Sequence, residues 1–173
     1  MTTYHHGNLR PALLRAAGKM LEKEGPAGIS LREAARRAGV SHAAPYRHFE
    51  DRDALLAELA AEGFEMLGEA MRGQTGRTMG EAYVRFALDH SQRFRLMFGG
   101  SLPLQKHSHL RTAASATYQG LVEAFKDMPH PELAAAAAWS LVHGLAHLKL
   151  DGHLAAQSVA DVIGAVRFAQ RAA

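Results

Sequence analysis

Two short helix starts separated by a glycine turn constrain this chain more than any other feature of its sequence. Ser30 and Glu33 have the spacing of a capping box, in which the serine caps the helix and the glutamate stands at its third position. Gly39 suits the left-handed turn that ends such a helix, and Ser41 can cap a second helix over residues 42–48. This arrangement is typical of a helix-turn-helix, which places its second helix in the major groove of DNA.

Helical periodicity dominates the remaining sequence, and the alternation typical of strands is almost absent. We therefore predict an all-α fold with two domains: a three-helix DNA-binding domain over residues 1–52 and a C-terminal bundle of about six helices over residues 53–173. Thr78 and Glu81 form a second capping box, and Asp51 can cap a long helix. Glycine and proline clusters separate the predicted helices, which span residues 8–24, 31–38, 42–48, 52–71, 78–98 with a break near 90–91, 110–126, 132–150 and 158–171.

The basic excess of the chain lies in its first third. Residues 1–55 contain nine Lys or Arg and six Asp or Glu, whereas residues 56–173 contain eleven of each. An N-terminal module that binds a polyanion is one interpretation of this distribution. Chance is the other, because an excess of three charges is small.

Several classes of protein are excluded or disfavoured. The chain has no cysteine, which excludes disulfides, thiolate zinc sites and cysteine nucleophiles. We find no Gly-rich phosphate loop, no nucleophile elbow and no paired carboxylates with an obvious partner, so no enzyme activity is expected. No apolar stretch approaches the roughly 20 residues needed to span a bilayer, and the N-terminus lacks the pattern of a signal peptide. We expect a cytoplasmic protein without a membrane partner.

The helix-turn-helix region carries a specific resemblance. It contains Ala-Gly-Val-Ser at 38–41 and Tyr-Arg-His-Phe at 46–49, followed by Glu-Asp-Arg-Asp at 50–53. In this order and spacing, these elements resemble the DNA-binding domain of the tetracycline-repressor family over roughly residues 8–60. The resemblance implies a homodimeric transcriptional regulator, a repressor that a small ligand releases from a near-palindromic operator in double-stranded DNA.

The resemblance also implies roles for individual residues. Tyr46, His48 and Arg52 match positions that meet DNA phosphates, which position a protein on the duplex. Arg32 matches a position from which a side chain reaches a base edge, and arginine suits guanine. The full set of predicted DNA contacts is Arg32, Ser41, His42, Ala43, Ala44, Tyr46, Arg47, His48 and Arg52.

Some residues of this region have other interpretations. Tyr46 could instead pack against Phe49, and Arg36 and Arg37 are expected to form only a solvated helix face. Pro45 departs from the family pattern, which usually has an aliphatic residue there. At about the fourth helical position, its missing N–H would forfeit one helical hydrogen bond and could tilt the short helix.

Small and apolar residues form a stripe along the predicted helix 132–150. On a monomer such an exposed stripe favours pairing with a twofold mate, and the family dimerises in this way. The segment Trp139–Gly144 also resembles the Trp-His-Gly signature of one branch of the family's C-terminal domains. We therefore expect a homodimer through the last two long helices, with its reading helices about 34–36 Å apart. The stripe consists of Ala134, Ala137, Ser140, Leu141, Gly144, Leu145 and Leu148.

A pocket for a small-molecule effector is expected among residues that face the axis of the C-terminal bundle. Most of the candidates could equally be ordinary core, and their character favours an apolar or weakly polar ligand. The candidates are Phe64, Leu67, Met71, Tyr83, Phe86, His90, Phe94, Phe98, Tyr118, Val122, Trp139 and His143.

Two alternatives to this function stay open. One is a metal-responsive regulator, since His143 and His147 have the i, i+4 spacing of a metal-binding pair. Without cysteine or a nearby acidic partner, we prefer a structural histidine near the dimer seam, and solvated loop histidines at His107 and His109. The other alternative is a DNA-binding protein without a ligand. We expect no cofactor and no bound metal.

Overall fold

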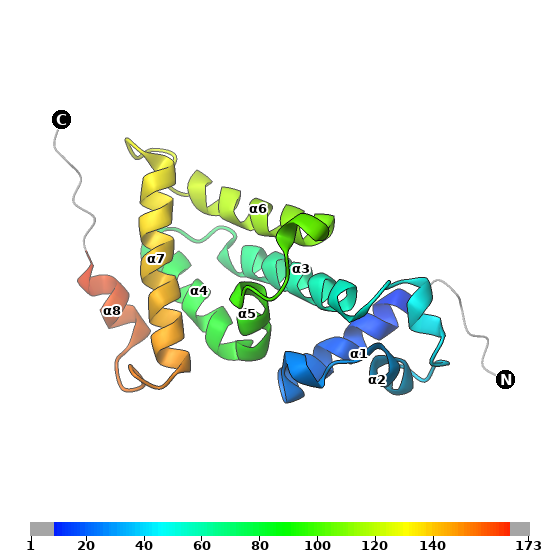
Figure 1. Cartoon of the computed structure of the whole chain (residues 1–173). Coiled ribbons are helices and arrows are strands. Elements are labelled where there is room, and N and C mark those ends of the chain that lie inside the picture. The colour runs from blue at the N-terminus through cyan, green and yellow to red at the C-terminus, as the bar shows by residue number, and fades with distance from the viewer. Residues whose placement is uncertain (1–8, 167–173) are drawn as a thin grey trace. The chain divides into compact units, whose positions relative to one another are not determined.

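The computed structural model describes residues 9–166, which form helices joined by turns and short loops (Figure 1). The expected all-α class is confirmed. The α-helices are α1 (Leu9–Glu24), α2 (Leu31–Arg37), α3 (Arg52–Met71), α4 (Gly76–Asp89), α5 (Ser91–Phe98), α6 (Ser108–Glu123), α7 (Pro131–Leu150) and α8 (Val159–Ala165). Short 3-10 helices are η2 (Pro26–Gly28), η3 (Ala44–Arg47) and η4 (Leu104–Lys106).

The chain divides into two compact units, and each is described by itself. The first contains the residues up to Glu65 together with His90–Ser115, and the second contains Met66–Asp89 together with the residues from Ala116 onward. Both α3 and α6 therefore contribute to each unit. The domain boundary predicted after residue 52 concerns function and stays a prediction, since a unit of packing and a functional domain need not share an edge.

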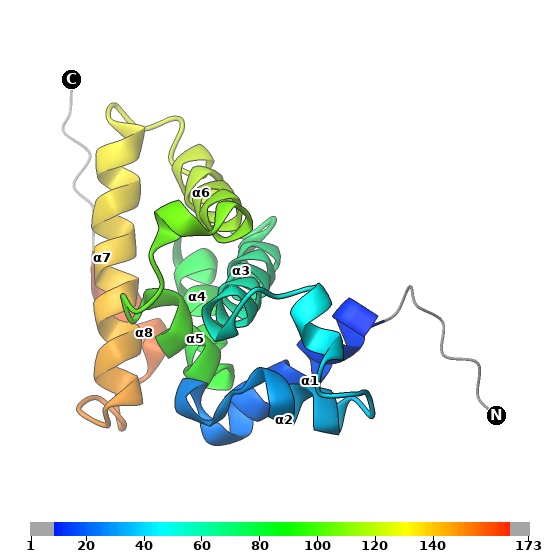
Figure 2. The ribbon, with the colours of Figure 1, turned by 45° about the vertical axis from the view of Figure 1, so that its right-hand side comes forward.

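In the first unit, α1 and α2 lie side by side (Figure 2). Leu13 and Ala17 of α1 are completely buried, since they lie one helical turn apart on the same face. The start of α2 is the predicted one: the Ser30 hydroxyl accepts a hydrogen bond from the Glu33 backbone N–H at 3.1 Å. Gly39 has a φ of 70°, which is the left-handed turn expected after α2.

The second helix of the motif is shorter than predicted. In place of a helix over 42–48, the structure has the 3-10 helix η3 over Ala44–Arg47, preceded by a turn. Pro45 explains this start, because it lies in the first turn of η3, where its fixed φ suits a helix. The expectation that Pro45 forfeits a helical hydrogen bond is also wrong. A backbone N–H in the first turn has no helical partner, so its absence loses no hydrogen bond.

In the second unit, α4 contacts both α7 and α8. A Cβ atom at Gly80 of α4 would lie 3.1 Å from Val142 Cγ1 of α7 and 3.2 Å from Ile163 Cδ1 of α8. These distances are shorter than ordinary van der Waals contacts. The missing side chain at this position therefore lets the three helices meet closely.

The ends of α4 and α8 differ from the expectation. α4 begins at Gly76, and the Thr78 hydroxyl bonds to the backbone of Thr75, so the predicted capping box with Glu81 is wrong. α8 ends at Ala165, and the predicted end of this helix lies outside the described residues.

α7 corrects the expectation that no segment approaches the length of a membrane span. Its 20 residues, Pro131–Leu150, are long and apolar enough to cross a bilayer by length and composition alone. One such helix is weak evidence, because core helices of globular proteins meet the same criterion. Here only part of the helix is buried within the second unit, at Ala135, Val142, Leu145 and Ala146.

Removing the cap of α2 is expected to destabilise the chain. Ser30→Ala deletes the acceptor of the Glu33 N–H and should lower the free energy of unfolding by about 1 kcal/mol. Ser115→Ala, a control at an exposed position of α6, should leave this free energy unchanged or slightly raised, because alanine is the better helix former. Urea unfolding followed by circular dichroism measures both variants. Equal effects of the two substitutions would show that the cap contributes nothing.

Candidate nucleic-acid interface and aromatic cluster

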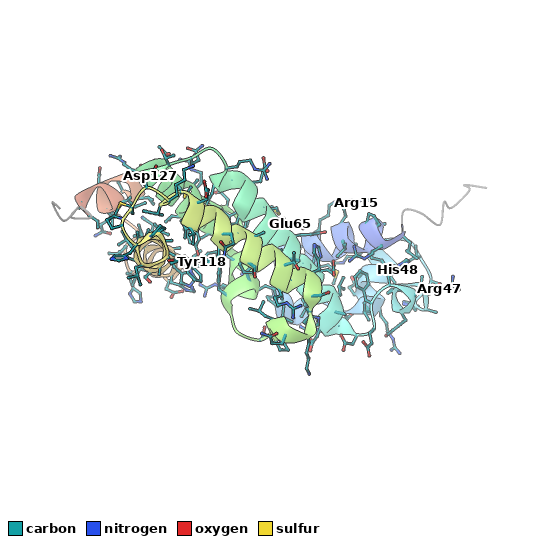
Figure 3. The ribbon with its side chains drawn as sticks, turned by 90° about the horizontal axis from the view of Figure 1, so that it is seen from above. Arg15, Arg47, His48, Glu65, Tyr118 and Asp127 are labelled. Atoms are coloured by element: carbon teal, nitrogen blue, oxygen red, sulfur yellow. The ribbon has the colours of Figure 1, made fainter. Side chains whose placement is uncertain are left out.

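The segment between α2 and α3 turns polar side chains outward. Pro45 and Phe49 are buried, one helical turn apart, and the Phe49 N–H donates to the Pro45 carbonyl at 3.0 Å. Between these two anchors, Tyr46 is 53% exposed. Arg47 and His48, labelled in Figure 3, are exposed as well. Tyr46 therefore does not pack inward, which was the alternative left open by the sequence.

Residues 41–49 form what we name the reading segment, and its first half is also open to solvent. Ser41, His42 and Ala43 are exposed, whereas Ala44 is half-buried. The exposed groups are small or flat. The segment can therefore approach another surface closely.

Four basic side chains of this region have no partner among residues 9–166. They form no hydrogen bond or ion pair there, and all four are exposed. They therefore remain available to an external group such as a phosphate or a base edge. These side chains are Arg32 at the start of α2, and His42, Arg47 and His48 in the reading segment.

Arg52 has a structural role that sequence reasoning missed. Its Nε donates to the Ile29 carbonyl at 2.9 Å, and its Nη2 donates to the Pro26 carbonyl at 2.6 Å. These bonds tie the start of α3 to the turn that precedes α2. The Arg52 side chain is still 43% exposed, so a phosphate contact stays a prediction beside this structural role.

Arg36 and Arg37, expected on a solvated face, take part in an ion-pair network. Glu33 bonds to Arg36 Nη2 at 2.6 Å and to Arg37 Nε at 2.7 Å. Arg37 also bonds to Glu24 of α1 at 2.6 Å. Hydrogen bonds from Arg36 and then Arg37 lower the pKa of Glu33 to about 2. The network fastens α2 to α1 and occupies both arginines, in contrast to Arg32 on the same helix.

Ionic contacts from α1 and α6 meet at Glu58 of α3. Arg10 pairs with Glu58, and its guanidinium also lies 5.6 Å from the centre of the Phe49 ring. His109 bonds through Nδ1 to Glu58 at 2.9 Å and through Nε2 to Glu65 at 3.0 Å. Hydrogen bonds to Glu58 and Glu65 raise the pKa of His109. The expectation of a solvated loop histidine is therefore wrong for His109, which lies in α6.

The predicted pocket residues are divided between the two units. In the first unit, the ring centres of Phe64 and Phe98 lie 5.3 Å apart, and those of Phe94 and Phe98 lie 4.9 Å apart. His90 has a carboxylate of α1 as a neighbour, with its Nδ1 3.9 Å from Glu22 Oε1. The first unit thus brings three of the predicted phenylalanines together.

In the second unit, Tyr83, Tyr118, Trp139 and His143 form what we name the aromatic cluster. Trp139 Nε1 donates to Tyr83 Oη at 3.0 Å, and this oxygen lies 2.8 Å from His143 Nδ1. The ring centres of Tyr118 and Trp139 are 5.8 Å apart. Burial raises the pKa of Tyr83, whereas burial and then the charge of His147 lower the pKa of His143. A neutral imidazole that accepts from the Tyr83 hydroxyl satisfies both groups.

Three of the other four candidates of the second unit have the burial of core residues. Leu67, Met71 and Phe86 are buried, and Val122 is half-buried. Burial alone does not separate a pocket wall from a packed core, so their role in ligand binding stays a prediction.

The histidine pair of α7 makes a ring contact. The ring centres of His143 and His147 lie 4.7 Å apart in an edge-to-face arrangement. Across residues 9–166, no three His, Cys, Asp or Glu side chains are grouped so that they could hold a metal ion. The metal-responsive alternative therefore gains no support from this pair.

Two protein-family models match the chain. Residues 13–59 match the model described as bacterial regulatory proteins, tetR family. Residues 76–170 match the model described as tetracyclin repressor-like, C-terminal domain. The reading segment lies in the first match, and the aromatic cluster lies in the second.

Solved structures share this fold. A protein of unknown function from Rhodococcus sp. RHA1 is 37% identical, with 95% of this chain and 94% of that chain covered and a TM-score of 0.82. A candidate regulatory protein, SCO4313, is 25% identical, with 92% and 93% covered and a TM-score of 0.74. The flavonoid-responsive regulator FrrA is 22% identical, with 92% and 93% covered and a TM-score of 0.64, and this similarity concerns the fold alone.

The low pKa of Glu33 predicts how its ion pairs with Arg36 and Arg37 respond to acid. Because its folded-state pKa of about 2 lies below the ordinary 4.5, the stabilisation by these ion pairs is complete above pH 4.5 and is lost as the pH falls toward 2. NMR of the Glu33 carboxyl carbon should show a titration midpoint near 2. In the Arg36→Gln/Arg37→Gln double variant, the midpoint should rise toward 4.5. An unchanged midpoint would show that the arginines do not hold this carboxylate.

Proposed function

The chain belongs to the tetracycline-repressor family of DNA-binding transcriptional regulators, and from this premise we propose that it is a repressor that a small apolar or weakly polar molecule releases from a near-palindromic operator. Regulators of this family are generally not enzymes. They typically dimerise and bind small-molecule effectors. A DNA-binding role puts the proposed site of action in the cytoplasm.

The exposure of the reading segment is the observation that carries this proposal. The burial of Pro45 and Phe49 anchors its backbone to the first unit, so the side chains between these two residues point toward solvent. A segment that only closed the fold would turn its aromatic group inward, whereas Tyr46 is 53% exposed. An exposed, positively charged turn on a rigid three-helix support is what binding to duplex DNA requires.

We assign the DNA contacts by the chemistry of each side chain. Tyr46, His48 and Arg52 would meet phosphates and set the register of the protein on the duplex. Arg32 would donate two hydrogen bonds to guanine O6 and N7. The remaining members of the set, which offer hydroxyl, imidazole, methyl and guanidinium groups to the major groove, are Ser41, His42, Ala43, Ala44 and Arg47.

An exposed stripe on α7 supports a homodimer. Ala137, Ser140 and Gly144 are exposed at spacings of three and four residues, and Leu148 is 43% exposed. Leu145 was expected in this stripe, but it is buried inside the second unit at 3% exposure. We propose that a second copy of the chain covers this face through α7 and α8. A twofold dimer would set the two reading segments one turn of DNA apart.

The aromatic cluster supports the proposed class of effector. Its rings offer faces for stacking, and its tyrosine, indole and imidazole groups offer few polar contacts. The FrrA regulator, which has a similar fold, is named as responsive to flavonoids. For this chain we propose only the broader class, an apolar or weakly polar molecule.

Two arginines of α2 provide a matched test of base reading. Arg32→Ala should weaken binding to the preferred duplex by roughly 1–3 kcal/mol and relax the preference at one position of each half-site. Arg36→Ala should leave the base preference unchanged, because Arg36 is paired with Glu33. Selection of duplexes from a random pool identifies the preferred site, and fluorescence anisotropy then measures the affinity of each variant.

Tyr46→Phe is the control for a general loss of affinity. It removes a hydroxyl that is proposed to meet a phosphate, so it should weaken binding to all duplexes by the same factor. If Arg32→Ala behaves like Tyr46→Phe, or has no effect, the base-reading role of Arg32 is wrong.

Two helical glycines test the proposed dimer. Among residues 9–166, a Cβ atom added at Gly120 or Gly144 meets nothing within 4 Å beyond its own helix. Gly120→Ala should therefore raise the free energy of unfolding by about 0.5–1 kcal/mol. Gly144→Ala should instead weaken the dimer, because the added methyl would meet the α7 helix of the second copy. Analytical ultracentrifugation measures the dissociation constant. A Gly144→Ala chain that is as dimeric as the wild type would exclude a seam at this residue.

A further inference from the structure

Arg93 of α5 is the charged side chain that is buried in the described part of the chain, at 7% exposure. Its Nη1 donates to the Leu59 carbonyl at 2.7 Å and lies 3.5 Å from Glu62 Oε2, and both partners are on α3. Its Nε lies 3.4 Å from Glu22 Oε1 on α1. A buried guanidinium needs such partners, because an unpaired buried charge is strongly destabilising. Arg93 therefore connects three helices of the first unit.

Two glycines make room for this side chain. A Cβ atom at Gly18 of α1 would lie 3.1 Å from Arg93 Nη2. A Cβ atom at Gly63 of α3 would lie 3.0 Å from Arg93 Cγ and 2.6 Å from Met97 Sδ. Side chains at these two positions would displace their neighbours on α5. The sequence thus combines the buried charge with the two small residues that admit it.

The packing of α5 differs from the division that the family match suggests. The C-terminal family model begins at residue 76 and includes α5, whereas α5 belongs to the same compact unit as α1 and the first part of α3. Arg93 contributes to this packing, because moving α5 away would strip its guanidinium of two carboxylates and a carbonyl. We propose that Arg93 fastens α5 to the DNA-binding helices, so that α5 moves with the reading segment and Arg93 is a positioning residue for DNA binding.

This inference rests on the proposed function, because α5 accompanies a DNA-binding element only if the reading segment binds DNA.

Native-state hydrogen exchange on the whole chain tests the fastening without DNA. In the wild type, the slowest amides of residues 91–98 should open together with those of residues 9–24, with the same dependence on denaturant. Glu22→Gln removes the α1 carboxylate at a partly exposed position. The variant should increase the exchange rate of α5 about tenfold more than that of α1. A tenfold change corresponds to the loss of one charge-assisted hydrogen bond. Lys19→Gln, a control at an exposed position of α1, should leave the two helices opening together.

A duplex selected by the wild-type chain supplies the functional readout. Its binding should slow exchange in residues 91–98, although these residues are not among the proposed DNA contacts. In the Glu22→Gln chain, the duplex should no longer slow exchange in residues 91–98, but it should still slow exchange in residues 41–49. Arg93→Lys keeps the charge but not the separate bonds of a guanidinium, and it should give an intermediate result. If Arg93 were only structural, both helices would lose stability alike and the effect of DNA on α5 would remain.

Two results would overturn the inference. One is independent opening of α5 and α1 in the wild type, and the other is a Glu22→Gln chain in which the duplex still slows α5 fully. Absence of duplex binding would instead contradict the proposed function. In that case the exchange without DNA would still decide whether Arg93 fastens α5 to α1.

Discussion

The burial of Pro45 and Phe49 is the constraint on which the proposed interface depends. These two residues close the short helix η3 onto the first unit, and a hydrogen bond from the Phe49 N–H to the Pro45 carbonyl joins them. Because both anchors point inward, the residues between them have no space in the core and turn outward. A proline in this position also fixes φ, which restricts the segment before any ligand binds. The reading segment is therefore a rigid turn rather than a long recognition helix.

Arginine has two distinct tasks in the first unit. One set of guanidiniums bonds to carboxylates and carbonyls of other elements and fastens the helices to one another. The other set has no partner within residues 9–166 and is exposed. This division matters because a guanidinium already bonded to a carboxylate gains less from a phosphate than an unpaired one does. The fastening set is Arg10, Arg37, Arg52 and Arg93, and the unpaired set near the reading segment is Arg32 and Arg47.

Helix caps, turn residues and hydrophobic periodicity predict most of the helices, but they do not predict contacts between residues that are distant in the sequence. The cap at Ser30 and the bounds of α3 follow from short-range chemistry that the sequence displays directly. One bond of Arg52 and one of Arg93 join residues that are 26 and 71 positions apart, so no rule based on local residue spacing predicts them. The same limit applies to the predicted pocket. Helical spacing indicates that residues share a face, but it does not indicate which helix that face meets, and the candidates are divided between two units. The expected loss of a hydrogen bond at Pro45 assumed a helix that begins at residue 42. The helix η3 begins at Ala44, so Pro45 lies in its first turn, where no such bond is lost.

The central claim is that the chain presents the reading segment to duplex DNA twice in one twofold assembly. Hydroxyl-radical footprinting of the whole chain on a selected duplex tests it most directly. The account predicts two protected patches on one face of the duplex, related by symmetry and centred about 10 base pairs apart. A single asymmetric patch, or no protection even at low salt, would contradict it.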